Sequence, residues 1–283
     1  MKTYLDCIPC FFSQALRAAR LSTNDEKKIK KVLDAVGMLL PKLPLESTPP
    51  ESARVIYHKI AEITGNPDPY RDIKRKSTQT ALSLFPALKR QVEKSDDRLL
   101  TAIRIAIAGN VIDFGASWDF DMETEVAEIL EKDFTECDYP RFKYRLNQAD
   151  EILYIGDNAG ECVFDRILIE EIKKPVIYVV RNSPIINDAT VEDAVQAGLD
   201  KVATILSSGA EGPGTILETC SLEFKNVYRK AKLIISKGQG NYEALSNETG
   251  PIFFLLKTKC HVIANDFGIN QGDIVLKESD AQV

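Results

Sequence analysis

Histidine is scarce in this sequence, whose 283 residues include only His58 and His261. HExxH zinc sites and catalytic triads with a histidine base need histidines at defined positions, so both classes of site are disfavoured. A catalytic metal would have to bind mainly carboxylate, amide and water oxygens. Such ligands suit Mg²⁺ or Mn²⁺ better than Zn²⁺.

Long apolar runs and a surplus of basic residues are also lacking. No run approaches the roughly 20 residues of a membrane helix, and the first residues, MKTYLDCIPC, lack the apolar core of a signal peptide. We therefore expect a cytoplasmic protein. The 36 basic and 42 acidic residues give a net charge of −6, which argues against a nucleic-acid or membrane-surface partner.

Cysteine is too infrequent for a disulfide scaffold, with six in the whole chain. Cys7 and Cys10 form a CxxC motif, which supplies half of a zinc site. A redox pair and a pair of partly buried thiols at a helix start remain open.

The first part of the chain, residues 1–150, has helical periodicity. Apolar residues repeat at helical spacing over 24–41. The next helical segment has Ser47 and Thr48 as possible N-caps and Gly65 as a stop signal. We expect an all-helical domain over this range.

The second part, residues 151–283, alternates short apolar runs with amphipathic stretches. Expected strands lie at 151–156, 175–180, 202–206, 232–236, 252–256 and 261–264. This alternation predicts an α/β fold, with a Rossmann-like, mostly parallel sheet flanked by helices. The runs are continuous, as in strands buried on both faces.

Polar segments follow most of these expected strands. They are GDNAGE at 156–161, RNSPIINDAT at 181–190, SSGAEGPGT at 207–215, KGQGN at 237–241 and ANDFG at 264–268. Parallel strands end at one sheet edge, where α/β proteins bind ligands. We therefore expect all five segments to border one crevice.

Asp157, Asn158 and Asp188 are the candidate metal ligands. Three oxygen donors on two neighbouring strand ends would suit a hard divalent cation and leave positions for water and substrate. The alternative is that the two acids are helix N-caps.

Lys237 and Gly238 are candidate phosphate-binding residues, because a lysine and glycine-loop N–H groups suit an anion. The alternative is a flexible turn with a surface lysine. Asn110 and Asp113 would share one helix face, or form a polar helix end stopped by Gly115.

Several motifs resemble those of the domain-of-unknown-function-89 family, also called the damage-control phosphatases. They are CxxC at 7–10, GNxxD at 109–113, GDNxGE at 156–161, NDxT at 187–190, SSGxxxPGT at 207–215 and KGxGN at 237–241. The CxxC matches the family's prokaryotic and archaeal subgroup. The resemblance implies a metal-dependent phosphatase acting on small phosphorylated metabolites, including sugar phosphates. It assigns Asp157, Asn158 and Asp188 to the metal (Mn²⁺, Mg²⁺, Co²⁺ or Ni²⁺) and Lys237 to phosphate.

We expect Asp157 and Lys237 to be catalytic, and Asn110, Asp113, Glu161, Lys237 and Gly238 to bind substrate. Hydrolysis would use metal-activated water. Direct attack by Asp157 is disfavoured because the position two residues on, where phosphoaspartate phosphatases carry a second Asp, is Ala159.

Two other functions are compatible with the sequence. One is an S-adenosylmethionine-dependent carboxyl methyltransferase, although GDNAGE supplies little glycine for that cofactor. The other is a non-catalytic protein that binds a metal or a sugar phosphate. The sequence leaves open the physiological substrate, the native metal, the oligomeric state and the role of the CxxC cysteines.

Overall fold

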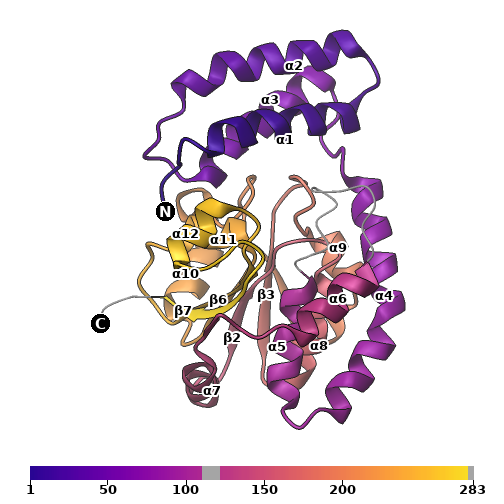
Figure 1. The fold of residues 1–283 in the computed structure, drawn as a ribbon, viewed down its shortest axis with the longest axis vertical. Helices are drawn as coiled ribbons and strands as arrows, with labels where there is room; N and C mark the ends of the chain where they lie inside the picture. Colours follow the sequence, from indigo (N-terminus) through magenta and orange to yellow (C-terminus); the bar gives the residue numbers. More distant parts are fainter. Residues whose placement is uncertain (110–121, 280–283) are drawn as a thin grey trace.

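A single seven-stranded sheet organises the molecule, with the strand order β1-β7-β6-β5-β2-β3-β4 (Figure 1). The computed structural model describes residues 1–109 and 122–279. Within them, neighbouring strands are parallel except β6 and β7, which are antiparallel. The expected α/β class with a mostly parallel sheet and a helical N-terminal region is confirmed.

The elements have the following bounds. The strands are β1 (Glu136–Cys137), β2 (Ile152–Ile155), β3 (Val176–Val180), β4 (Thr204–Ser207), β5 (Ile234–Lys237), β6 (Ile252–Lys257) and β7 (Ile274–Glu278). The α-helices are α1 (Cys7–Ser22), α2 (Glu26–Leu39), α3 (Pro49–Thr64), α4 (Arg71–Lys94), α5 (Arg98–Gly109), α6 (Met122–Glu131), α7 (Tyr139–Gln148), α8 (Cys162–Ile172), α9 (Val191–Gln196), α10 (Leu222–Lys230), α11 (Gln239–Leu245) and α12 (His261–Phe267). Three short 3₁₀ helices are Leu40–Lys42, Leu199–Lys201 and Leu217–Thr219.

The central strands are apolar throughout because both faces of the sheet are covered. All four residues of β2 are buried. Ile152 and Tyr154 join the core under α4, α5 and α8, whereas Leu153 and Ile155 join the core under α10, α11 and α12. Figure 1 shows these two helical layers on opposite sides of the sheet. Alternate side chains of one strand thus contribute to two cores.

Helices α1, α2 and α3 form a third core of their own. The expected caps of α3 are present: Thr48 forms a capping box with Glu51, and Gly65 ends the helix with a positive φ of 75°. These three helices lie beyond one end of the sheet, above it in Figure 1. No helix in the described ranges is long and apolar enough to cross a membrane.

The remaining N-terminal helices belong to the sheet core. Residues of α4, α5 and α7 share one cluster with the strands, and the short strand β1 pairs with β7. β1 lies before residue 150, where no strand was expected. The division into 1–150 and 151–283 stays a prediction.

The expected strand at 261–264 is wrong, because these residues begin helix α12. Cys260 is its N-cap and Gly268, with φ 70°, its C-cap, so the segment ANDFG lies in this helix and not at a strand end. The last strand is β7, which runs antiparallel to β6. A four-residue apolar run cannot by itself separate a strand from a buried helix.

The order in which strands are added to the sheet changes direction at β2. Strands β3 and β4 follow on one side of β2, and β5 and β6 lie on the other. The carboxyl ends of β2 and β5 therefore border a topological switch point, where open α/β sheets bind ligands. Residues 156–161 and 237–241 are placed at this position.

The capping box of α3 gives a test of the fold. Replacing Thr48 by Ala removes the oxygen that accepts from the Glu51 backbone N–H, so we expect unfolding free energy to fall by about 1 kcal/mol. Urea unfolding measures the change. Thr80→Ala, in the interior of α4, is the control and should not destabilise the chain, because Ala has the higher helix propensity. Equal losses in the two variants would contradict the cap assignment.

Candidate functional site

Asp157 lies directly after β2, at the carboxyl edge of the sheet. The preceding turn requires glycine, because a Cβ at Gly156 would lie 2.4 Å from the Tyr178 hydroxyl oxygen. The Gly156 N–H donates to Val179 O at 3.0 Å, which keeps the chain alongside β3 up to this point. Asp157 is thus buried at a defined position beyond the strand.

The segment containing Asp188 pairs with the segment after β2. Asn158 and Asp188 form an isolated antiparallel bridge. Ala189 N donates to Asp157 O at 2.8 Å, and Ala159 N donates to Asn187 O at 2.9 Å. These bonds bring Asp188 next to the other two expected metal ligands, Asp157 and Asn158, although it lies 30 residues after Asn158 in the sequence.

Burial and nearby negative charges both raise the pKa of Asp157. Burial raises the pKa of Asp157 well above its ordinary value, and the nearby charges of Glu161 and Asp188 raise it further. Lys259 and Arg181 oppose this effect, but burial and the two acids prevail, so a negative charge on Asp157 is disfavoured without a further cation. A divalent cation would neutralise that charge, so the donor chemistry fits a hard metal ion.

Asn158 connects two of these carboxylates. Its Nδ2 donates to Asp157 Oδ2 at 2.9 Å and to Glu161 Oε2 at 3.1 Å. Its expected metal ligand is the other amide atom, Oδ1. In the described ranges, no three His, Cys, Asp or Glu side chains are grouped so that they could hold a metal. The expected site has two carboxylates, and its third protein donor is an amide.

Lys237 is the last residue of β5 and is completely buried, so it is not the surface lysine of the alternative interpretation. Its ammonium group donates to Glu161 Oε1, to Asp165 Oδ1 at 2.7 Å and to Ala106 O at 2.8 Å. Burial alone would lower the pKa of Lys237, but Asp165 and Glu161 outweigh that effect and raise it. Lys237, Glu161 and Asp165 form the buried ion cluster.

Asp165 was not expected from the sequence. It lies on α8, one turn after Glu161, and accepts from the hydroxyls of Tyr154 and Tyr178 at 2.7 Å each. Burial raises the pKa of Asp165 to about 6, although Lys237 acts in the opposite direction. The i,i+4 spacing of Glu161 and Asp165 is the signal that could have identified the pair.

Arg181 was also missed, although it directly follows β3. Its guanidinium group is buried and donates to Asp188 Oδ2 at 2.8 Å, to Thr215 Oγ1 at 3.0 Å and to Asn241 Oδ1 at 3.0 Å. Charge-assisted bonds of this kind have a fixed geometry. Arg181 therefore orients Asp188 and joins the segments after β3, β4 and β5.

Gly238 is in direct contact with Asp157. Its φ is +78°, and a Cβ at this position would lie 1.9 Å from Asp157 Oδ2. Asn241 Nδ2 donates to Lys237 O at 2.8 Å and to Gly156 O at 3.0 Å, so it holds the two segments side by side. The glycine thus allows the backbone after β5 to approach the carboxylate after β2.

The expected residues Asn110 and Asp113 lie outside the described residues. Gly109, the last residue of α5, is next to the site: a Cβ there would lie 3.2 Å from Glu161 Cγ. The glycine-rich loop after β4 also borders this region, because a Cβ at Gly214 would lie 2.4 Å from Gly240 O. Two of its N–H groups, of Gly209 and Ala210, are bonded to serine hydroxyls within the loop.

Cys7 and Cys10 lie in the first turn of α1, away from the acidic residues. Burial raises the pKa of both thiols. Gln14 Nε2 donates to Cys10 Sγ at 3.1 Å. Reactive dithiols have a lowered pKa, so the raised pKa of these thiols does not favour a redox role.

Relatives of this chain are found by sequence over almost its full length. A damage-control phosphatase of Pyrococcus horikoshii is 37% identical over 97% of this chain and 97% of the relative. A damage-control phosphatase of Archaeoglobus fulgidus is 35% identical over 96% and 97%. An uncharacterized protein of Methanocaldococcus jannaschii is 36% identical over 96% and 93%.

Comparison of the fold with solved structures finds a similar relative. The crystal structure of a DUF89 family protein from Pyrococcus horikoshii matches with a TM-score of 0.91 and 35% identity, covering 99% of this chain and 100% of that one. The model of the damage-control phosphatase ARMT1-like domain matches residues 3–275. The chain belongs to the damage-control phosphatase ARMT1-like (DUF89) family, and this membership supports a phosphatase role.

Proposed function

We propose that this protein is a divalent-metal-dependent phosphatase that hydrolyses small phosphorylated metabolites, such as sugar phosphates. The observation that carries the proposal is the pairing of the segments after β2 and β3 at the switch point, which places Asp188 beside Asp157 and Asn158. Burial and the neighbouring acids raise the pKa of Asp157 there. A cation and a phosphate group bound there would compensate each other's charge. A cytoplasmic location and the lack of a nucleic-acid partner stay predictions.

Asp157, Asp188 and the Asn158 amide oxygen would hold the metal, which we expect to be Mn²⁺, Mg²⁺, Co²⁺ or Ni²⁺. A cation bound there would act as a Lewis acid on a phosphate oxygen and make a bound water more acidic. The protein's part is to keep the ligands in position. Arg181 orients Asp188 at 2.8 Å, and Glu161 accepts from Asn158 at 3.1 Å.

Lys237 places a positive charge beside Glu161 in the same region. Its three hydrogens meet Glu161, Asp165 and the Ala106 carbonyl. Direct contact with a phosphate oxygen therefore requires one of these acceptors to be replaced. We propose that Lys237 acts at least as a positioning residue, because it fixes Glu161, which in turn fixes the Asn158 amide.

Substrate would enter next to Gly238, on the side of Asp157. Phosphoryl transfer requires that the nucleophile and the leaving oxygen are in line and that charge on the phosphoryl oxygens is neutralised. Gly238, Glu161, Asn110 and Asp113 are the proposed substrate-binding residues. Because these residues come from different segments of the chain, some of them would contact the phosphate and others the organic part of the substrate.

Replacing Asp157 by Asn tests the metal site. We expect kcat/KM for p-nitrophenyl phosphate with Mn²⁺ to fall about a thousandfold or more, because a charged ligand is lost. Mn²⁺ binding, measured by calorimetry, should weaken in parallel. The matched control is Asp200→Asn, an exposed acid in a 3₁₀ helix. Unchanged activity and metal affinity in Asp157→Asn would refute the assignment.

Gly238→Ala tests the contact between Gly238 and Asp157. The new Cβ would displace the Asp157 carboxylate, so we expect kcat/KM to fall about a hundredfold, the scale of a small misplacement at an active site. Gly268→Ala is a close control, because its φ is +70° but no atom lies within 4 Å of the new Cβ. Gly238→Ala should lose more stability than Gly268→Ala, because Gly238 has φ 78° and ψ 165°, a region that only glycine adopts readily, whereas Gly268 has the left-handed values φ 70° and ψ 30°. Activity is therefore compared per amount of folded protein. A loss of activity shared equally by both would show that the contact is unimportant.

Lys237→Ala should lower kcat/KM by two to three orders of magnitude, or about 3–4 kcal/mol. Lys237→Arg should rescue only part of this. The affinity for Mn²⁺ should weaken less than in Asp157→Asn, because Lys237 acts on the Asn158 ligand only through Glu161. Separate kcat and KM values decide whether ground-state binding is involved.

Because Lys237→Ala leaves two buried carboxylates without their cation, it should also destabilise the fold. The double variant Lys237→Ala/Asp165→Asn removes one of these charges and should regain stability without regaining activity. Activity that returns together with stability would mean that Lys237 serves the fold alone.

A further inference from the structure

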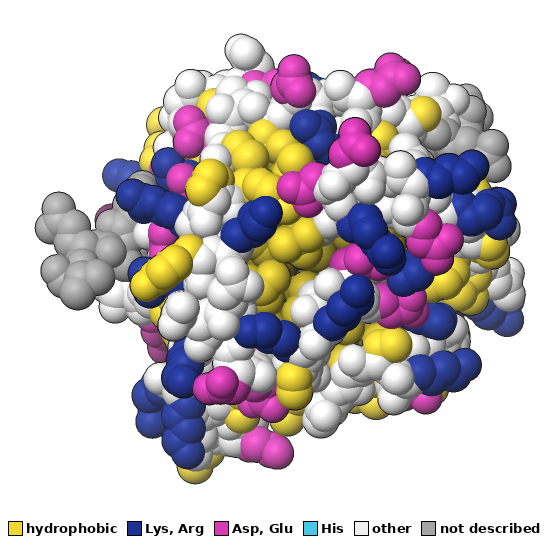
Figure 2. Space-filling model, turned by 90° about the horizontal axis from the view of Figure 1, so that it is seen from below, with side chains coloured by type: hydrophobic (Ala, Val, Ile, Leu, Met, Phe, Trp, Pro, Cys, Tyr) yellow, Lys and Arg dark blue, Asp and Glu magenta, His cyan; other side chains and the backbone are white. Residues whose placement is uncertain are grey.

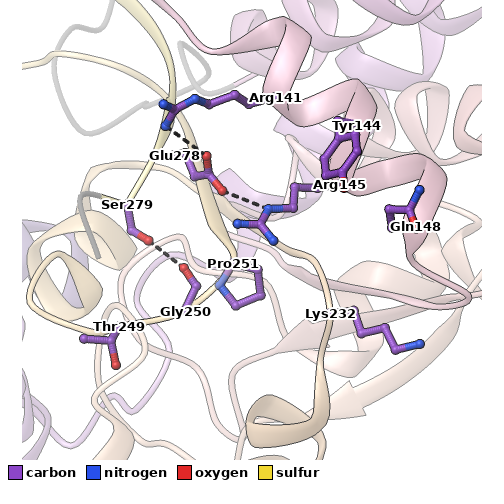
Figure 3. Close-up of a pocket in the computed structure, with 10 residues that line it drawn as sticks. All are labelled: Arg141, Tyr144, Arg145, Gln148, Lys232, Thr249, Gly250, Pro251, Glu278 and Ser279. Carbon is purple, nitrogen blue, oxygen red and sulfur yellow. Dashed lines mark hydrogen bonds and ion pairs between the residues drawn. The ribbon is translucent and has the colours of Figure 1, made fainter. Parts of the chain in front are cut away.

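A pocket of about 920 Å³ lies between α7 and the loops that border β5, β6 and β7. Figure 3 shows its lining residues: Arg141, Tyr144, Arg145, Gln148, Lys232, Thr249, Gly250, Pro251, Glu278 and Ser279. Its volume is at the upper end of the range for small-molecule sites. None of these residues was singled out in the sequence.

The pocket is on the opposite edge of the sheet from the candidate site. Lys232 and Pro251 lie just before β5 and β6, at the amino ends of these parallel strands, and Glu278 ends the antiparallel strand β7. Asp157 and Gly238 follow the carboxyl ends of β2 and β5. The length of the strands therefore separates the two sites.

Basic side chains dominate the pocket. Arg141 and Arg145 are one turn apart on α7 and both contact Glu278, at 3.4 Å and 3.1 Å. Lys232 is the third cation, and its contact with the exposed Asp150, at 3.0 Å, is a surface ion pair of small energy. Three cations with one lining carboxylate leave positive charge in a chain whose net charge is −6.

Arg145 is arranged to bind an anion. It uses Nε for the nearly buried Glu278, and this bond sets the plane of its guanidinium group. In Figure 3 the group points toward Pro251, in the middle of the lining residues. Arg141 is 72% exposed and Lys232 is 65% exposed, so both can turn toward a ligand. Planar guanidinium groups bind phosphate through paired hydrogen bonds.

The lining also offers surfaces for an organic group. The ring of Tyr144 is exposed, and Pro251 provides a second apolar surface in the lining. Helix α7 is at the lower end of the molecule in Figure 1. The view of this end from below shows many Lys and Arg side chains, with Asp and Glu among them, around a hydrophobic hollow (Figure 2). A single inorganic phosphate ion would occupy only a small part of the pocket volume.

We propose that this pocket is a second binding site, which takes an organic phosphate. The phosphate group lies between Arg145, Arg141 and Lys232, and the organic group lies against Tyr144 and Pro251. The site is distinct from the proposed metal site and does not depend on it, because no residue is shared. A phosphorylated metabolite bound here would be available to regulate the enzyme from the far edge of the sheet.

Calorimetric titration of the full chain with ATP and with glucose 6-phosphate, without divalent metal and at physiological salt, tests the proposal. At least one of the two should bind with a Kd below about 1 mM. Arg141→Gln/Lys232→Gln should weaken that binding about tenfold or more, the effect of losing two charged contacts. Inorganic phosphate should bind more weakly than the organic compound, because it cannot contact Tyr144 and Pro251.

The control is Lys27→Gln/Lys28→Gln, which makes the same charge change on exposed residues of α2. It should leave the Kd unchanged. The proposal is overturned if neither compound binds with a Kd below about 1 mM, if the two double variants weaken binding equally, or if inorganic phosphate binds as tightly as the organic compounds. A failed phosphatase assay would leave this result unaffected, since only binding is measured.

Discussion

The contact between Lys237, Glu161 and Asp165 is the interaction on which the candidate site depends. It joins the end of β5 to the first turns of α8, and Ala106 O ties α5 to the same ammonium group. Such a buried cluster costs desolvation energy for each charge, so it tolerates no missing partner. The two tyrosine hydroxyls on Asp165 satisfy the carboxylate that Lys237 alone would leave incompletely bonded.

A second buried hub complements the first. Arg181 binds Asp188, Thr215 and Asn241, and Asn241 in turn binds the backbone of Gly156 and Lys237. The segments after β2, β3, β4 and β5 therefore behave as one rigid edge. Preorganisation of this kind favours catalysis, because ligands that are already in place need no reorganisation when charge develops on a substrate.

The two edges of the sheet have opposite electrostatic character. At the carboxyl edge, burial and the neighbouring acids Glu161 and Asp188 raise the pKa of Asp157, which favours a bound cation. At the other edge, two arginines share the Glu278 carboxylate and a lysine pairs with the exposed Asp150, and the three cations favour an anion. A parallel sheet makes this separation possible, since its strands start at one edge and end at the other. The family relationship bears on the first edge, and the second is a property of this structure.

The sequence by itself determined the α/β class, five of the strands, the caps of α3 and the position of Asp157, Asn158, Asp188 and Gly238 at strand ends, because these depend on local periodicity and on the geometry of parallel sheets. The tertiary structure decided that HVIA is a helix, that β7 closes the sheet antiparallel to β6, and that Lys237 is buried among acids. Asp165, Arg181 and Asn241 were missed for the same reason. Their partners are 4 to 85 residues away in the chain, and which distant side chains meet is set by packing. Only the i,i+4 spacing of Glu161 and Asp165 is visible locally.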